Sequence, residues 1–247
     1  EKASEVSGAR FYYMKGGLAE LMFALTNYAI DVLIEEGYTL MRTPYMLREP
    51  YMKKAAELGD FKESLYKIEG EELYLIATSE QSLAVFHADE ILEEKELPIR
   101  YIGYSPCFRR EAGAHGKDTK GLFRVHHFDK IEQFVFTTPE ESWNEMERMI
   151  KISEKVVEGL GFAYRTIDIA SGDLNDNASR KYDIEVWMPV QGTYRELISC
   201  SNLIDYQARK LNIKMNKGNE KVILHTLNST GLPIERCLVA IIENYQN

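Results

Sequence analysis

Residues 108–133 constrain the fold more than any other part of the chain, because they predict two β-strands joined by a long, basic, glycine-bearing loop. One row of alternate residues in the second strand is mostly apolar: Phe123, Val125, Ile131 and Val135. The other row is mostly charged or aromatic: Arg124, His126, Phe128, Lys130 and Glu132. Alternate side chains of a strand point to opposite faces, so the second row forms either a solvated outer face or a platform for a ligand. The alternation alone favours the solvated face.

The neighbouring strand favours the ligand platform. Residues 101–111 end with Arg109 and Glu111, which share a face just before the loop. The loop supplies glycines and lysines: Gly113, Gly116, Gly121, Lys117 and Lys120. Charged residues on adjacent strands beside such a loop predict a polyanion held against a sheet.

The sequence FRREAG…GLFRVHHFDKIE within this stretch resembles motif 2 of the class II aminoacyl-tRNA synthetases, and among them the seryl-tRNA synthetases. Residues 18–44 predict a long helix and a strand that ends at Thr43-Pro44, and they resemble motif 1. The sequence NSTGLPIERCLVAIIENYQ resembles motif 3. The order of the elements and the resemblance both predict an α+β fold with a mainly antiparallel β-sheet flanked by helices. We expect residues 1–247 to form one catalytic domain.

The resemblance implies that ATP activates serine to seryl-adenylate and that the seryl group is transferred to tRNA(Ser). It places these residues at ATP: Arg109, Arg110, Glu111, Arg124, Val125, Phe128, Glu196, Leu197, Ile198, Ser199 and Arg236. It places these at serine: Thr78, Glu80, Arg109, Glu132, Asn228 and Thr230. The implied catalytic residues are Arg109, Glu196 and Arg236, and the implied Mg²⁺ ligands are Glu196 and Ser199.

Several of these residues carry expectations of their own. Thr78-Ser79-Glu80 predicts an N-cap that opens a helix. Glu196 and Ser199 are three residues apart in a predicted strand, so they reach one metal ion only if a bulge or a strand end lies between them. Arg236 is a cation in the first turns of a predicted helix, where it opposes the macrodipole unless an anion binds there.

Periodicity and turn residues predict the remaining elements. We expect helices over residues 18–36, ended by Gly37, and over 45–70 and 141–161, a strand that runs into a helix within 73–92, and a helix opened by Gly231-Leu232-Pro233. We expect strands over residues 38–42, 164–170, 193–202 and 222–230, and a loop that becomes a strand within 172–190.

Composition limits partners and location. The formal net charge of −9 and the pI of about 5.2 predict that any contact with nucleic acid is local. Cys107, Cys200 and Cys237 lie far apart without CxxC spacing, which favours a reduced, cytoplasmic protein and leaves open only a zinc site built from distant residues. We expect no signal peptide and no apolar run that spans a membrane. The chain begins with Glu rather than Met, which predicts a fragment or a processed form.

The resemblance also implies partners. The motif 1 region would form a homodimer, and the loop from Ala112 to Lys120 would meet the acceptor end of tRNA(Ser). The chain departs from the family at Glu235, where bacterial members usually have glycine, and at Leu203-Ile204. The N-terminal coiled-coil arm and the tail after motif 3 have no counterpart. Two alternatives therefore stay open: an amino-acid:carrier-protein ligase and a non-catalytic synthetase paralogue.

Overall fold

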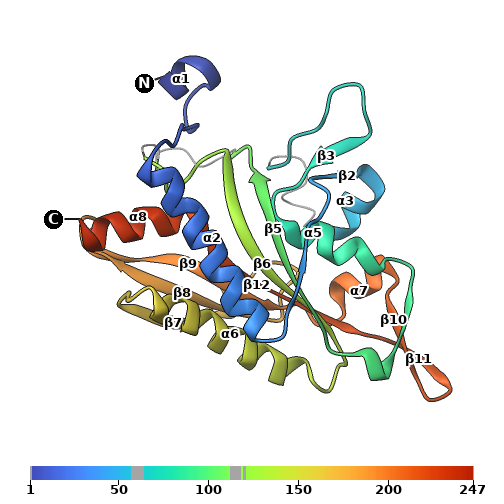
Figure 1. The fold of residues 1–247 in the computed structure, drawn as a ribbon. Helices are drawn as coiled ribbons and strands as arrows, with labels where there is room; N and C mark the ends of the chain where they lie inside the picture. The colour runs from blue at the N-terminus through green and yellow to red at the C-terminus, as the bar shows by residue number, and fades with distance from the viewer. Residues whose placement is uncertain (1, 57–63, 112–117, 119–120, 247) are drawn as a thin grey trace.

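The computed structural model describes residues 2–56, 64–111, 118 and 121–246 (Figure 1). Its centre is a seven-stranded sheet, with strands in the order β1 (Thr39–Met41), β5 (Ile99–Phe108), β6 (His127–Thr137), β12 (His225–Pro233), β9 (Thr193–Asn202), β8 (Arg180–Met188) and β7 (Tyr164–Asp168). Strand β1 pairs with β5 in parallel, and each other neighbouring pair is antiparallel. The predicted α+β fold with a mainly antiparallel sheet is confirmed.

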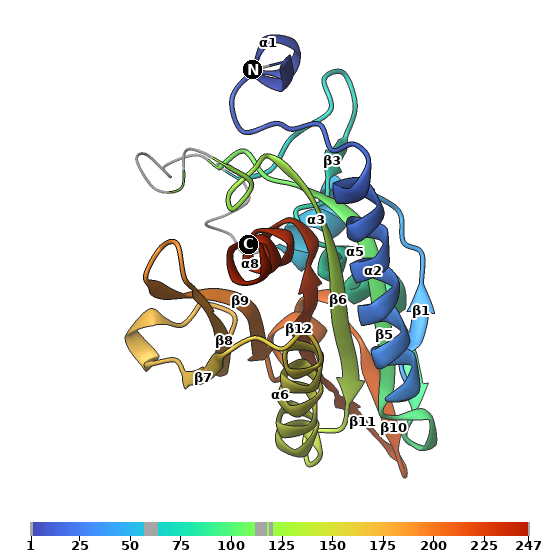
Figure 2. The same ribbon diagram turned by 60° about the vertical axis from the view of Figure 1, so that its left-hand side comes forward.

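Three helices pack on one face of this sheet (Figures 1 and 2): α2 (Gly17–Glu35), α6 (Ser142–Gly159) and α8 (Ile234–Tyr245). The buried side of α2 contributes Leu25 and Leu33 to a core that also contains Ile131 and Val135 of β6. This core is the largest set of buried apolar residues in the described chain, and it keeps the sheet and these helices together. Gly37 has a φ of +83°, so it ends α2 as predicted.

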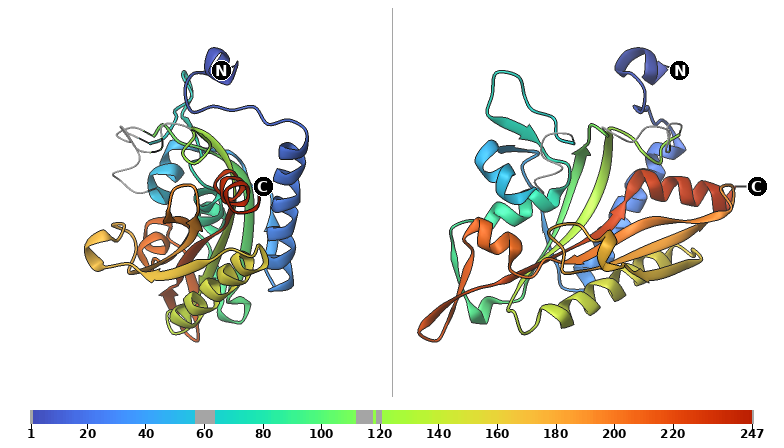
Figure 3. Two further views of the ribbon diagram at one scale, coloured as in Figure 1. Left: turned by 90° about the vertical axis from the view of Figure 1, so that its left-hand side faces the viewer. Right: turned by 180° about the vertical axis from the view of Figure 1, so that it is seen from behind.

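The opposite face carries shorter elements: α3 (Glu49–Ala55), α5 (Ser79–Ala84) and α7 (Tyr206–Leu211). Phe134 and Phe136 of β6 pack there against Leu83 of α5 and Leu211 of α7. Strands β2 (Met46–Arg48) and β3 (Leu73–Leu75) pair beside α3, while β11 (Glu220–Ile223), β10 (Lys214–Lys217) and β4 (Ile91–Glu93) form a small sheet at one end of the molecule (Figure 3). The other short elements are α1 (Lys2–Ser7), η1 (Val85–His87), η2 (Glu94–Glu96) and η3 (Ser171–Asp173).

The alternation of β6 separates two environments. Its odd-numbered residues Ile131 and Val135 face the helical core, so the even-numbered residues face the other side. On that side Lys130 and Glu132 are buried, with only 7% and 2% of their surfaces exposed. The charged row is therefore not a solvated outer face, and burying it requires a specific role or partner.

Two segments predicted to form or open helices contain strand residues that were not predicted from the sequence. Within residues 45–70, β2 precedes α3, because Met46–Arg48 pairs with β3, and residues 57–63 lie outside the described part. Gly231-Leu232-Pro233 forms the end of β12 and also leads directly into α8, because Pro233 is the N-cap of that helix. A Cβ on Gly231 would lie 2.9 Å from Ile131 Cγ2 and 2.9 Å from Leu33 Cδ1, so glycine lets the bulged strand approach α2 closely.

Helix α2 has the length and apolar composition of a membrane-spanning helix, although no such run was expected from the sequence. Leu25, Ala29 and Leu33 of this helix are nevertheless buried in the core beside β6. Apolar helices in the cores of proteins outside membranes meet the same criterion.

Candidate active site

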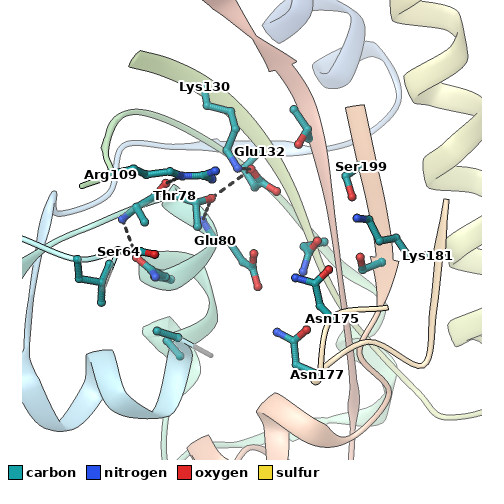
Figure 4. Close-up of a pocket in the computed structure, with 18 of the residues that line it drawn as sticks. Ser64, Thr78, Glu80, Arg109, Lys130, Glu132, Asn175, Asn177, Lys181 and Ser199 are labelled. Carbon is teal, nitrogen blue, oxygen red and sulfur yellow. Dashed lines mark hydrogen bonds and ion pairs between the residues drawn. The ribbon is translucent and has the colours of Figure 1, made fainter. Parts of the chain in front are cut away.

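The buried charged row of β6 faces a cavity of about 570 Å³. Figure 4 shows one side of this cavity with Thr78, Arg109, Lys130 and Glu132, and the other side with Asn175, Asn177, Lys181 and Ser199. The first side comes from β5, β6 and the start of α5, and the second from β8, β9 and the segment before β8. Apart from the segment before β8, the lining thus belongs to strands of the sheet, to their ends, or to the start of a helix packed on the sheet.

Thr78 connects the helix cap to the cavity. Its Oγ1 accepts a hydrogen bond from the Glu80 backbone N–H at 3.2 Å, which confirms the predicted N-cap of α5. The same hydroxyl donates to Glu132 Oε2 at 3.2 Å. Lys130 forms an ion pair with that carboxylate. Glu132 therefore presents a hydrogen-bonded, charge-compensated carboxylate to the cavity.

Glu80 is held by a hydrogen bond from α7. The side-chain amide of Gln207, on α7, donates to Glu80 Oε1 at 2.8 Å, and Gln207 Oε1 accepts from Thr226 Oγ1 at 3.2 Å. Asn228 and Thr230 of β12 line the same cavity. The structure thus brings together all the residues that the sequence assigned to serine: Thr78, Glu80, Arg109, Glu132, Asn228 and Thr230.

A second, smaller cavity of about 80 Å³ adjoins the first. Both cavities are lined by Arg109, Glu111, Arg124, Lys130, Glu196 and Thr230. The smaller one adds Phe128, Val125 and Arg236. Arg109 and Arg236, from distant parts of the chain, therefore open onto one continuous site that also contains Glu132.

The guanidinium groups of this site are positioned by specific contacts. Arg109 Nε donates to the carbonyl oxygen of Ala77 at 3.2 Å, and its Cζ lies 5.1 Å from the centre of the Phe128 ring. Arg124 Nη1 donates to Glu111 at 2.7 Å, while Arg124 Nε is buried without a partner among the described residues. A buried donor of this kind is satisfied when an anionic or polar ligand fills the site.

Arg236 lies across the Phe123 ring. Its Nε donates to the carbonyl oxygen of Phe123 at 3.1 Å, and its Nη1 lies 3.6 Å from Glu196 Oε1. Burial lowers the pKa of Arg236, nearby Glu196 raises it, and the guanidinium groups of Arg109 and Arg124 lower it. This convergence of like charges favours a polyanionic ligand.

Strand β9 contains the irregularity that the sequence required. Ile184 pairs with Ile198 and Glu185 pairs with Glu196, so Leu197 is an extra residue in β9. This bulge lets Glu196 and Ser199 line the same cavity, which confirms the prediction. Among the described residues, no group of three or more His, Cys, Asp or Glu side chains could hold a metal ion, so the zinc site that the sequence left open gains no support.

A carboxylate and a hydroxyl nevertheless fit Mg²⁺. This ion prefers hard oxygen ligands and usually keeps several from water and substrate phosphates. Glu196 and Ser199 line the larger cavity and Glu196 also lines the smaller one, so their oxygen atoms could serve as two such ligands beside the guanidinium groups.

Two of the sequence-assigned ATP residues stand apart from the others. Arg110 and Ile198 line neither of these two cavities: the Arg110 backbone N–H donates to Ser64, and Ile198 is buried in the core. Five residues at or beside the site were not predicted from the sequence: Lys130, Gln207, Asn175, Asn177 and Lys181. Lys130 carried a signal, because it belongs to the charged row of β6, whereas the position of Gln207 beside Glu80 depends on packing.

The comparison with known families explains this arrangement. Residues 62–245 match the family described as "tRNA synthetase class II core domain (G, H, P, S and T)". The chain belongs to this class II synthetase family. Among curated class II synthetases, the chain is 55% identical over 246 residues to a serine–tRNA ligase of Thermoplasma volcanium, with 100% of this chain and 56% of the relative covered. It is 52% identical to the serine–tRNA ligase of Archaeoglobus fulgidus over 249 residues, with 100% and 55% covered.

Solved class II synthetase structures agree. The crystal structure of seryl-tRNA synthetase from Pyrococcus horikoshii complexed with ATP is 49% identical and superposes with a TM-score of 0.97, covering 100% of this chain and 56% of that chain. A cytoplasmic serine–tRNA ligase from Naegleria fowleri in complex with AMP is 48% identical, with a TM-score of 0.96, covering 100% and 59%. The chain thus spans little more than half the length of the synthetases that it matches.

Proposed function

We propose that this chain is the catalytic core of a serine–tRNA ligase, which activates serine with ATP and transfers it to tRNA(Ser). The observation that carries the proposal is the single site that contains Arg109, Arg236 and Glu132. Guanidinium groups suit a triphosphate, and a hydrogen-bonded carboxylate suits the ammonium and hydroxyl of serine. The relatives named serine–tRNA ligase, and the similar structures with ATP or AMP bound, support the same function.

In the first step the serine carboxylate attacks the α-phosphate of ATP, and pyrophosphate leaves. The nucleophile is already an anion, so the protein needs to align the reactants and neutralise charge rather than remove a proton. Arg109 lies where the two cavities meet, and it therefore contacts both the attacking carboxylate and the α-phosphate. Phe128 stacks on the adenine, and Arg236 binds the γ-phosphate.

Serine is selected in the larger cavity. Glu132, Thr78 and Glu80 offer hydrogen-bonding groups to the ammonium and hydroxyl of the substrate. An analogue without the hydroxyl leaves one of these buried polar groups without its partner, and such a site discriminates by large factors. Lys130 balances the charge of Glu132 at the border between the two cavities.

Mg²⁺ would be held by Glu196 and Ser199, and it would neutralise charge on the phosphates. Glu196 also forms an ion pair with Arg236. Binding of the triphosphate would therefore give both side chains new partners.

We extend the proposal to the partners. The chain dimerises through α2 and β1, where large apolar side chains are exposed: Leu18, Phe23, Ile34 and Leu40. Sedimentation of the protein as a monomer would contradict this proposed dimer. The loop assigned to the tRNA acceptor end, residues 112–120, lies outside the described residues except for Asp118. We also propose one catalytic domain in a cytoplasmic protein; its three cysteines are free and buried.

Exchange between ATP and pyrophosphate that depends on serine tests the function. Wild-type protein should catalyse it, and Arg109→Ala should reduce it by at least about a hundredfold, because the carboxylate and the α-phosphate lose their shared partner. Arg180→Ala is the control, since Arg180 pairs with Asp168 at the protein surface. Exchange with glycine or alanine instead of serine would favour a carrier-protein ligase, and no exchange with any amino acid would favour a non-catalytic paralogue.

A further inference from the structure

Glu235 is a buried carboxylate in the first turn of α8, directly before Arg236. It is 1% exposed and lines the smaller cavity. A buried carboxylate is strongly destabilising unless hydrogen-bond donors surround it. Its presence here therefore calls for partners and a role.

The contacts of Glu235 join three separate segments. Its Oε2 accepts a hydrogen bond from the backbone N–H of Asp129 in β6 at 2.9 Å. Its Oε1 accepts a hydrogen bond from the hydroxyl of Tyr12, in the segment before α2. The Tyr12 ring is stacked on His127 of β6, with ring centres 6.1 Å apart. Glu235 thus ties the start of α8 to both β6 and the N-terminal segment.

The groups around Glu235 are polar or aromatic, and they interact with one another. Burial raises the pKa of Glu235 to about 7, and burial also raises the pKa of Asp129. Tyr104 of β5 donates a hydrogen bond to Asp129 Oδ2 at 3.2 Å. Glu235, Asp129, Tyr12, Tyr104 and His127 therefore form one cluster on the side of β6 that faces α8.

The two ends of the Glu235–Asp129 bond are each one residue from the nucleotide site. Asp129 follows Phe128, and Glu235 precedes Arg236. Phe128 and Arg236 both line the smaller cavity. Phe128 is also fixed by the ladder that β6 forms with β5, in which it pairs with Cys107. The position of Arg236 relative to Phe128 therefore depends on how the start of α8 is tied to β6.

We infer that Glu235 is a positioning residue. It sets the distance between the Phe128 ring, which stacks on adenine, and the Arg236 guanidinium, which binds the γ-phosphate. This inference rests on the proposed function, because it assigns Phe128 and Arg236 to the two ends of ATP. Without Glu235 the first turn of α8 shifts on β6. A ligand that reaches both Phe128 and Arg236 then loses affinity, whereas a ligand that reaches only Phe128 does not.

Calorimetric binding of ATP and of AMP tests the inference. Glu235→Ala should weaken ATP binding about tenfold and change AMP binding by less than about twofold, because AMP lacks the γ-phosphate and one charged hydrogen bond corresponds to about a factor of ten. Glu235→Gln keeps an acceptor for the Asp129 N–H and a donor toward Tyr12, so it should restore ATP affinity to within about threefold. Glu243→Ala is the matched control, because Glu243 lies on the same helix and contacts Val190 and Gln191 at the surface.

Tyr12→Phe keeps the test valid if Glu235→Ala does not fold, since it removes a single hydroxyl and leaves the ring stacked on His127. It should weaken ATP binding about threefold and leave AMP binding unchanged. Equal losses of ATP and AMP affinity, or no loss of either, would overturn the inference. Binding needs no turnover, so wild-type protein that binds ATP but fails to activate serine refutes the proposed function alone. Wild-type protein that binds no ATP refutes both.

Discussion

Gln207→Met should weaken serine binding while leaving ATP binding nearly unchanged. Gln207 lies on α7 and is 1% exposed, with its amide bonded to Glu80 on one side and to Thr226 on the other. Methionine has a similar length and volume but offers neither the donor nor the acceptor. The substitution therefore removes two hydrogen bonds without opening a large cavity.

The magnitude follows from these two bonds. The bond from Gln207 to the Glu80 carboxylate, at 2.8 Å, is worth about 1.5–3 kcal/mol as a hydrogen bond to a charged group. Without this bond the Glu80 carboxylate loses its fixed orientation, and the KM for serine rises by roughly ten- to a hundredfold. The Thr226 hydroxyl is fully buried, and leaving it without this acceptor costs about 1–3 kcal/mol of folding stability.

The assay is serine-dependent exchange of ATP and pyrophosphate, with serine and ATP varied separately and Tm measured on the same samples. Gln133→Met is the matched control. Gln133 is an equally buried amide in β6, bonded to Ser153 at 3.0 Å on the face away from the cavity. It should lower Tm and leave the KM for serine unchanged. The reasoning is refuted if folded Gln207→Met has the wild-type KM for serine, or if both variants raise that KM equally.

Three further substitutions test other parts of the structure. Gly103→Ala should destabilise the protein by about 1–3 kcal/mol and raise the KM for serine. Its new methyl group would lie 2.7 Å from Ser79 Oγ and displace the start of α5, whereas Gly172→Ala meets no atom within 4 Å and should be neutral. Glu235→Gln should become progressively more stable relative to wild type as the pH rises from about 4.5 to 7, measured by urea unfolding at each pH. Burial raises the folded-state pKa of Glu235 from 4.5 to about 7. The protonated side chain therefore contributes folding stability below pH 4.5, and the wild-type protein loses up to roughly 3 kcal/mol of it as the pH rises to 7. An unchanged difference across this range would contradict the burial argument. Glu196→Gln should raise the Mg²⁺ concentration for half-maximal exchange about tenfold, since a neutral amide is a weaker ligand than a carboxylate; an unchanged Mg²⁺ dependence would remove Glu196 from the metal site.

The sequence by itself determined the local features of the site. Thr78 caps α5 because a hydroxyl before a helix satisfies an N–H of the first turn, and this depends only on neighbouring residues. For Glu196 and Ser199 to reach one ion, their spacing required a bulge or a strand end, because side-chain direction alternates along any strand; the structure has a bulge at Leu197. Helix α2 and its termination at Gly37 likewise followed from periodicity and from a backbone conformation that glycine adopts readily.

Only the tertiary structure decided which elements cover each face of β6. Alternation defines two faces but does not say what covers them, and on its own it favoured a solvated face for Lys130 and Glu132. Both are buried because β8, β9 and α5 enclose the cavity beside them. The contacts of Gln207 with Glu80 and of Glu235 with Tyr12 span 127 and 223 residues of chain. No local pattern encodes such pairs, because their geometry arises only when separate helices and strands pack on one sheet.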